Sequence, residues 1–288
     1  MQRVRMRGWG AFGVLFVSLI LLGSLPGSTK AQQVNSTPRR VYVIAHRGAS
    51  AYAPENTLAA FKQAIMLHSD ILELDVHQTK DLRLVVIHDA TVDRTTNGKG
   101  RIKDLTLEEL RQLDAGSWFS PAFAAERVPL LDEVLDLASN SVSLLIELKE
   151  GSDEYPNIEE RIVRLVREKN VEKHVIFKSF HDETLDRLRQ LAPEIPRLKI
   201  VFLQIPVVSI IVGRGLAFGS VLDDSVQYLQ HHWFGLTESF VTEAHSSGYR
   251  VFAWDVNDKD RMKELILRGI DGIETDYPDI LSKLIHAE

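Results

Sequence analysis

The 288-residue sequence contains no cysteine and no long run of basic residues. The absence of cysteine excludes disulfides, thiolate metal sites and lipidated cysteines, and it is compatible with export from the cell. The formal net charge of −6 opposes binding to a nucleic-acid backbone. No internal repeat and no low-complexity tract is present. The whole sequence is 44% hydrophobic and 26% charged, a composition typical of a soluble enzyme. Its length allows one large domain or two ordinary ones.

One long hydrophobic run stands at the N-terminus, over residues 9–22. Three arginines precede it, and small residues follow it as far as Ala31. This order predicts a secretory signal peptide, residues 1–31, with cleavage near Ala31. The alternative is an uncleaved membrane anchor, although the run is somewhat shorter than the about 20 residues that span a bilayer. A polar linker, residues 32–40, would connect it to a folded domain over residues 41–288.

Four short runs rich in valine, isoleucine and leucine carry charged residues at or near their ends. The runs are 41–45, 71–76, 84–87 and 142–146. Buried strands that end in charged residues indicate a site at the rim of a sheet, and in a β/α barrel that rim carries the chemistry. The charged groups are His46-Arg47-Gly48, Glu73-Leu74-Asp75, His88-Asp89 and Glu147-Leu148-Lys149.

Strand and helix patterns alternate through the chain, which predicts parallel strands with helical crossovers. The expected class is α/β, and eight such strands are the number of a closed (β/α)8 TIM barrel. The predicted strands are 41–45, 71–76, 143–148, 174–179, 199–203, 218–222, 250–256 and 272–276. The predicted helices are 57–67, 128–138, 158–169, 182–191, 237–246, 259–267 and 278–285, with a weaker crossover helix at 206–215.

A further strand, 84–87, follows the second barrel strand after only seven residues, 77–83. A parallel crossover needs a dozen residues or more, so this strand must return antiparallel as a β-hairpin. The hairpin would bring His88 beside Asp75. Residues 89–127 would then form a loop excursion over the rim, with a capping box opening a short helix at Thr106.

Three carboxylates, Glu73, Asp75 and Glu147, share this rim. Glu73 and Asp75 point to the same face of their strand because side chains at i and i+2 do so. Carboxylates held this close repel one another unless a cation lies between them. Ligation by oxygen alone favours Mg²⁺, Ca²⁺ or Mn²⁺ over zinc.

The remaining rim residues suit phosphate chemistry. His46 and His88 titrate near neutral pH and can transfer protons. Arg47 and Lys149 are cations that can bind a phosphate. No cysteine is available as nucleophile, and neither a serine nor a lysine of the set is an obvious one. Water is one candidate nucleophile, and a hydroxyl of the substrate itself is the better one because it is already tethered.

These residues resemble the glycerophosphodiester phosphodiesterase family, whose members are β/α barrels. The resemblance runs from about Val43 to Leu284. It is carried by His46-Arg47-Gly48, Pro54-Glu55-Asn56-Thr57, Glu73-Leu74-Asp75-Val76, Thr79-Lys80-Asp81, Val85-Val86-Ile87-His88-Asp89, Asp93-Arg94-Thr95-Thr96-Asn97-Gly98, Ile146-Glu147-Leu148-Lys149, Ser179-Phe180, Trp254-Asp255-Val256-Asn257 and Thr275-Asp276-Tyr277-Pro278.

The resemblance implies that Glu73, Asp75 and Glu147 bind one divalent cation. It implies that His46 and His88 are the acid–base pair, and which of them is the acid stays open. The implied reaction is hydrolysis of a glycerophosphodiester to sn-glycerol 3-phosphate and an alcohol. The identity of the metal, the alcohol and the oligomeric state stay open as well.

The resemblance further implies that Arg47 and Lys149 hold the phosphate and that Trp254 lines the glycerol pocket. Trp254 could also be plain barrel core. Asp255 stands where the family usually has threonine, which leaves the preferred leaving group open. The expected partner is a small-molecule substrate, with no nucleic acid, and with a membrane only through an uncleaved N-terminal segment.

Three polar residues have two interpretations each. Asn56 is either a helix cap or a site residue, and His77 is either a site residue or solvated. Asp276 either belongs to the end of the last strand or caps the final helix.

Two other functions remain open. One is a phosphodiesterase for lysophospholipids or sphingomyelin, because Trp118, Phe119 and Phe123 of the excursion offer apolar surface for acyl chains. The other is a secreted, non-catalytic barrel that binds phosphate or a glycan, since a fold alone does not establish catalysis. The complete set of charged rim residues argues against the second.

Overall fold

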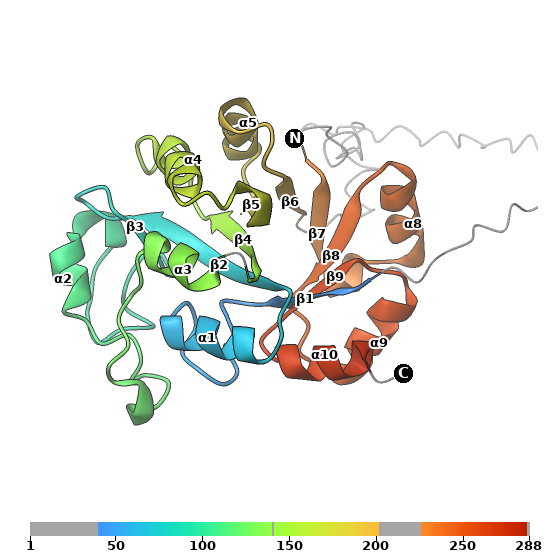
Figure 1. Ribbon diagram of the computed structural model, residues 1–288, viewed down its shortest axis with the longest axis horizontal. Coiled ribbons are helices and arrows are strands. Elements are labelled where there is room, and N and C mark those ends of the chain that lie inside the picture. The colour runs from blue at the N-terminus through green and yellow to red at the C-terminus, as the bar shows by residue number, and fades with distance from the viewer. Residues whose placement is uncertain (1–39, 140, 202–225, 287–288) are drawn as a thin grey trace, which may run out of the picture. The chain divides into compact units, whose positions relative to one another are not determined.

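The computed structural model describes residues 40–139, 141–201 and 226–286. All of them belong to one compact unit spanning 38–288. Eight parallel strands of this unit lie side by side, with helices on the outer face of the sheet (Figure 1). The strands are β1 (Tyr42–Ala45), β2 (Ile71–Gln78), β4 (Ser143–Leu148), β5 (Val175–Ser179), β6 (Arg197–Val201), β7 (Tyr228–His232), β8 (Arg250–Trp254) and β9 (Gly272–Thr275).

The sheet closes on itself. The strand order is β1-β9-β8-β7-β6-β5-β4-β2, and β1 also pairs with β2. Inside the ring, Ile44, Leu145, Leu198 and Phe252 belong to one buried cluster. Gly272 leaves space for that packing, since a Cβ at this position would lie 2.8 Å from the ring of Phe252. The predicted (β/α)8 TIM barrel is confirmed.

The helices follow the predicted pattern closely. Helix α4 buries Ile158, Ile162 and Val166 along one stripe, the spacing of an amphipathic helix. Helix α1 begins after Thr57, whose side chain accepts a hydrogen bond from the Ala60 backbone. The described helices are α1 (Leu58–Met66), α2 (Leu107–Arg111), α3 (Leu131–Ala138), α4 (Ile158–Glu168), α5 (Asp182–Leu191), α8 (Glu238–Ser246), α9 (Lys259–Leu267) and α10 (Pro278–Ile285).

Strand β3 (Leu84–Val86) runs antiparallel to β2, as the short connection requires. The backbone of Ile87 continues the pairing by donating to the carbonyl of Asp75 over 3.0 Å. His88 is therefore delivered to the end of β2, and the predicted hairpin is confirmed. The capping box of α2 is also present, formed by Thr106 and Glu109.

The sixth predicted barrel strand does not coincide with the strand that the structure places at that position of the ring. The segment 218–222 lies outside the described residues, and the strand between β6 and β8 is β7 (Tyr228–His232). Its sequence is polar and rich in histidine, so it does not resemble an apolar barrel strand. Gln230 is nevertheless fully buried, and its side-chain amide donates a hydrogen bond to Glu274 inside the barrel. Strand β6 also begins two residues earlier than predicted.

The predicted signal peptide, linker and 206–215 helix concern residues outside the described set, apart from Arg40 at the end of the linker. Among the described residues, no helix combines the length and apolar character needed to cross a bilayer.

Candidate active site

A cavity of about 420 Å³ lies at the carboxyl ends of the barrel strands. Strands of a parallel barrel all point toward this end, so residues that close different strands meet there. All eight predicted site residues line this cavity, and their roles stay predictions. They are His46, Arg47, Glu73, Asp75, His88, Glu147, Lys149 and Trp254.

The three predicted metal ligands converge from two neighbouring strands. Asp75 of β2 lies opposite Glu147 of β4 in the register, and Glu73 shares the face of Asp75. Each offers a carboxylate oxygen, and these oxygens lie within 4.8 Å of one another. All three side chains are almost fully buried. Hard oxygen donors grouped in this way fit Mg²⁺, Ca²⁺ or Mn²⁺.

Two cations border this carboxylate group. Lys149 Nζ lies 2.7 Å from Glu147 Oε1 and 3.4 Å from Asp75 Oδ1. Arg47 Nε lies 3.4 Å from Asp75 Oδ2, and the Arg47 backbone donates to Glu73 Oε2 over 3.0 Å. Burial tends to raise the pKa of Asp75, but Lys149 and Arg47 outweigh it and hold that pKa well below its usual range.

Glu73 has the opposite balance. Burial raises its pKa to about 7, against the opposing positive charge of Lys178. A carboxyl group whose pKa is raised in this way lacks enough positive charge nearby to stabilise its ionised form. A divalent cation would supply that charge, so Glu73 fits the role of a ligand.

His46 is held by the final strand. Its Nδ1 lies 2.7 Å from Asp276 Oδ1, and Asp276 itself accepts from Ser50 over 2.8 Å and from Asn257 over 2.6 Å. Burial lowers the pKa of His46, but the Asp276 hydrogen bond and the charge of Glu274 more than compensate, so the pKa rises to about 9. Asp276 does not cap α10, which begins after Tyr277 without a side-chain cap. It orients the histidine instead.

His88 is held differently. Its Nδ1 lies 2.6 Å from Asp89 Oδ1, and Arg94 donates to Asp89 over 2.8 Å. Arg94 also reaches Glu55 over 2.7 Å, and Glu55 accepts from Arg47 over 2.8 Å. Burial lowers the pKa of His88, and the positive charges of the site add to this effect against the opposing charge of Asp75. The pKa values of the two histidines are therefore shifted in opposite directions.

The structure shows the hydrogen-bond partners of His77 and Asn56, two residues with alternative interpretations. His77 is buried, not solvated, with Nδ1 2.8 Å from the Tyr155 hydroxyl and Nε2 3.0 Å from the His88 carbonyl. It thus supports the backbone that carries His88. Asn56 donates from its amide to Asp75 Oδ2 over 2.8 Å, so it contacts the site, while Thr57 caps the helix.

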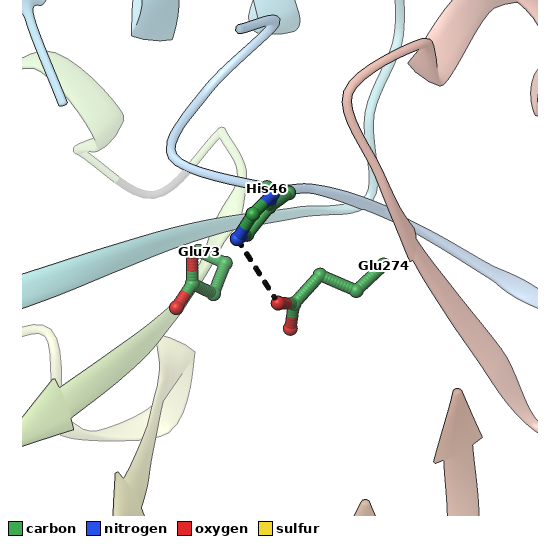
Figure 2. Close-up of side chains that lie close together, drawn as sticks. All are labelled: His46, Glu73 and Glu274. Atoms are coloured by element: carbon green, nitrogen blue, oxygen red, sulfur yellow. Dashed lines mark ion pairs between the residues drawn. The ribbon is translucent and has the colours of Figure 1, made fainter. Parts of the chain in front are cut away.

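The sequence interpretation missed three buried polar residues: Lys178 of β5, Gln230 of β7 and Glu274 of β9. Lys178 and Glu274 line the cavity. Lys178 Nζ lies 3.0 Å from Glu73 Oε1 and 3.0 Å from Glu274 Oε2. Figure 2 shows His46, Glu73 and Glu274 close together, with the carboxylate of Glu274 directed at the His46 ring. Lys178 and Glu274 could have been found from the sequence. Each is the single charged residue of a mostly apolar strand, at a position whose side chain the alternation of the strand directs inward.

Comparison with known proteins agrees with this geometry. The model of the glycerophosphoryl diester phosphodiesterase family matches residues 46–280. A glycerophosphodiester phosphodiesterase of Caldanaerobacter subterraneus is 42% identical over 249 residues, covering 85% of this chain and 98% of that protein. One from Bacillus subtilis is 33% identical over 295 residues, covering 95% and 96% respectively.

Solved structures give the same result. An Oleispira antarctica phosphodiesterase, in complex with the product sn-glycerol-3-phosphate, matches with a TM-score of 0.74 at 31% identity, covering 85% of this chain and 96% of that one. A glycerophosphodiester phosphodiesterase from Agrobacterium tumefaciens matches with a TM-score of 0.70 at 30% identity, covering 84% and 99%. The chain therefore belongs to the glycerophosphoryl diester phosphodiesterase family, whose members are phosphoric diester hydrolases.

Proposed function

We propose that this protein hydrolyses glycerophosphodiesters to sn-glycerol 3-phosphate and an alcohol, with the aid of one divalent cation. The observation that carries the proposal is the cluster of Glu73, Asp75 and Glu147 oxygens, which lie within 4.8 Å of one another in a cavity that two histidines share. The related phosphodiesterase solved with sn-glycerol-3-phosphate supports this choice of product.

Glu73, Asp75 and Glu147 would hold the cation. When bound, a divalent ion supplies Lewis acidity toward phosphoryl and hydroxyl oxygens. Arg47 and Lys149 would bind the phosphate and stabilise the charge that develops on it. Lys149 already lies between two ligand carboxylates, so its ammonium is held in place before substrate arrives.

We assign the acid to His46 and the base to His88. At neutral pH the raised pKa of His46 keeps its imidazole protonated, so it can donate a proton to the departing alcohol. The lowered pKa of His88 keeps its imidazole neutral, so it can accept one. Environments that separate the pKa values of two groups are the usual basis for such roles.

The attacking group would be the glycerol hydroxyl next to the phosphate. An intramolecular nucleophile gains an effective concentration of about 10⁵ M or more. His88 would take its proton, and a cyclic phosphate would form and then be opened by water. Direct attack by water is the competing route.

Trp254 would line the glycerol pocket together with Phe180. Their rings meet edge to face with centroids 6.2 Å apart, and both line the cavity. An amphipathic indole of this kind suits a small polyol that presents carbon on one face and hydroxyls on the other.

The lipid-directed alternative loses its support in the described residues. Phe119 packs edge to face on both Trp118 and Phe123, with ring centroids 5.8 and 5.7 Å apart. None of the three is among the described residues that line the cavity. The non-catalytic alternative is disfavoured because each site histidine has its own orienting carboxylate.

We also propose that the chain is exported. The support is the basic, then apolar, then small-residue order of residues 1–31. An extracytoplasmic location would give the enzyme access to diesters in the surroundings of the cell.

A direct test is turnover of a panel of glycerophosphodiesters, glycerophosphocholine and glycerophosphoethanolamine among them, with and without chelator. Formation of glycerol 3-phosphate would be followed by a coupled dehydrogenase. The expected result is release of glycerol 3-phosphate that stops in excess EDTA. No release from any diester would sink the proposed function, and faster hydrolysis of lysophosphatidylcholine would favour the lipid-directed alternative.

A further inference from the structure

Lys178 lines the same cavity as the carboxylate cluster and lies among three acids. Its Nζ lies 3.0 Å from Glu73 Oε1, 3.2 Å from Glu147 Oε2 and 3.0 Å from Glu274 Oε2. All four side chains are almost fully buried. A buried ammonium with three carboxylates around it is itself a bound cation.

Glu73 belongs to two groups that could each hold a cation. One is the predicted metal site with Asp75 and Glu147, and the other is formed with His46 and Glu274. In Figure 2 the carboxylate of Glu274 points toward His46, whose Nε2 is 3.8 Å from Glu274 Oε1, and Glu73 lies beside them. Lys178 contacts both carboxylates of this second group.

Gln230 adds an independent observation at this second group. Its Nε2 donates to Glu274 Oε2 over 2.6 Å. Its Oε1 is buried and has no hydrogen-bond partner among the described residues. An amide oxygen is a hard donor of the type that Mg²⁺ and Mn²⁺ accept. The second group therefore offers a cation the Gln230 oxygen in addition to the carboxylate oxygens of Glu73 and Glu274 that Lys178 contacts.

We propose that Lys178 is a built-in cation that fills the second position and thereby limits the centre to one divalent ion, held by Glu73, Asp75 and Glu147. The inference deepens the proposed function and rests on it, because it concerns the same metal centre. Lys178 is a positioning residue, since its ammonium holds Glu73 and Glu147 at the wall of the cavity.

Charge balance supports this role. His46 and Asp276 form a pair of opposite charges that cancel. The other four carboxylates, those of Glu73, Asp75, Glu147 and Glu274, face the cations of Arg47, Lys149 and Lys178, which leaves one negative charge. One divalent ion together with a singly charged phosphodiester would bring the centre to neutrality. Without Lys178 the centre would carry a further buried negative charge, which is costly unless another cation enters.

The test counts metal ions. The full-length chain would be treated with chelator, dialysed and titrated with Mn²⁺, with bound ions counted by electron paramagnetic resonance and elemental analysis. The expected result is one ion per chain for the unchanged protein and two for Lys178→Ala, where the shortened side chain leaves room for an ion. The double variant Lys178→Ala/Glu274→Gln should return to one.

Lys149→Ala is the matched control. It removes a positive charge from the same carboxylate cluster, but Lys149 contacts Asp75 and Glu147, whereas Lys178 contacts Glu73, Glu147 and Glu274. It should therefore keep one ion per chain. A gain of a second ion in Lys149→Ala as well would show that general charge, not the position of Lys178, sets the number, and would overturn the inference.

Two further results would overturn it: two ions in the unchanged protein, or only one ion in Lys178→Ala. If Lys178→Ala does not fold, the double variant decides, because its buried charge is balanced, and two ions there would contradict the inference. Hydrolysis is measured separately on the same samples. An active enzyme whose Lys178→Ala variant binds one ion keeps the proposed function and loses only this inference.

Discussion

The Nδ1 of His46 lies 2.7 Å from Oδ1 of Asp276, a residue 230 positions later in the chain. The contact joins the first and last strands of the barrel, β1 and β9, which are neighbours because the sheet closes. It directs the opposite nitrogen, Nε2, into the cavity. The protonation state of His46 therefore depends on barrel closure.

The His46→Ala and His88→Ala variants should differ in whether a substrate with a good leaving group restores their turnover. Replacing either His46 or His88 by alanine should lower turnover by about 10²–10⁴-fold, the usual worth of acid–base catalysis. A substrate with a good leaving group, such as a p-nitrophenyl diester, should restore His46→Ala but not His88→Ala, because a good leaving group needs no proton. Steady-state rates on both substrates check this. Rescue of His88→Ala alone would reverse the assignment.

The His46–Asp276 pair should make stability depend on pH. The pKa of His46 is raised from 6.5 to about 9, so its contribution is complete below about pH 6.5 and is lost as pH rises through 9. The pKa of Asp276 is lowered from 3.8, with burial opposed by the His46 hydrogen bond, so its contribution is lost below about pH 3.8.

The Asp276→Asn variant should therefore differ most from the unchanged protein in free energy of unfolding between about pH 4 and pH 9. Urea unfolding at a series of pH values, in chelator, measures the difference. Asp279→Asn is a suitable control outside the cavity, since Asp279 bonds Tyr52 and Lys283. A stability difference for Asp276→Asn that persists unchanged at pH 10.5 would contradict the role of the pair.

Chelation should abolish activity, and Mg²⁺, Ca²⁺ or Mn²⁺ should restore it. The reason is that Glu73, Asp75 and Glu147 offer oxygen donors only, which favour hard cations. Activity in excess EDTA followed by metal titration checks the prediction, and Glu147→Gln should raise the metal concentration that gives half-maximal activity. Full turnover in EDTA, with no metal in the protein, would refute it.

A substrate without the glycerol 2-hydroxyl should bind but be barely cleaved. The 2-hydroxyl is the proposed nucleophile, and its tethering supplies much of the rate. The deoxy analogue should act as a competitive inhibitor with a turnover lowered by several powers of ten. Equal cleavage of the deoxy analogue and the parent diester would leave water as the nucleophile.

Export should leave a mature N-terminus near Gln32. The basic and apolar order of residues 1–31 is the reason. N-terminal sequencing of the protein from its native host measures this directly. An intact Met1 in a membrane fraction would favour the anchor.

Local sequence was enough to predict the barrel and eight of the residues that line its cavity. Charged residues such as Glu147 and Lys149 follow an apolar strand, and alternation within a strand is a local property. The seven-residue connection between 71–76 and 84–87 likewise permits only a hairpin. Strand β7 was not predicted because its sequence contains Gln230 and two histidines and so lacks the apolar pattern of a barrel strand. Gln230 is compatible with a buried position only because its side chain bonds Glu274 inside the barrel.

The tertiary structure alone decided which charges meet. Lys178 and Glu274 come from strands β5 and β9, far apart in the chain, yet their charged atoms are 3.0 Å apart. The opposite pKa shifts of His46 and His88 also depend on neighbours that the closed barrel supplies. Electrostatic energies vary with distance and burial, and both are set by how the strands close into a barrel, which no local pattern encodes.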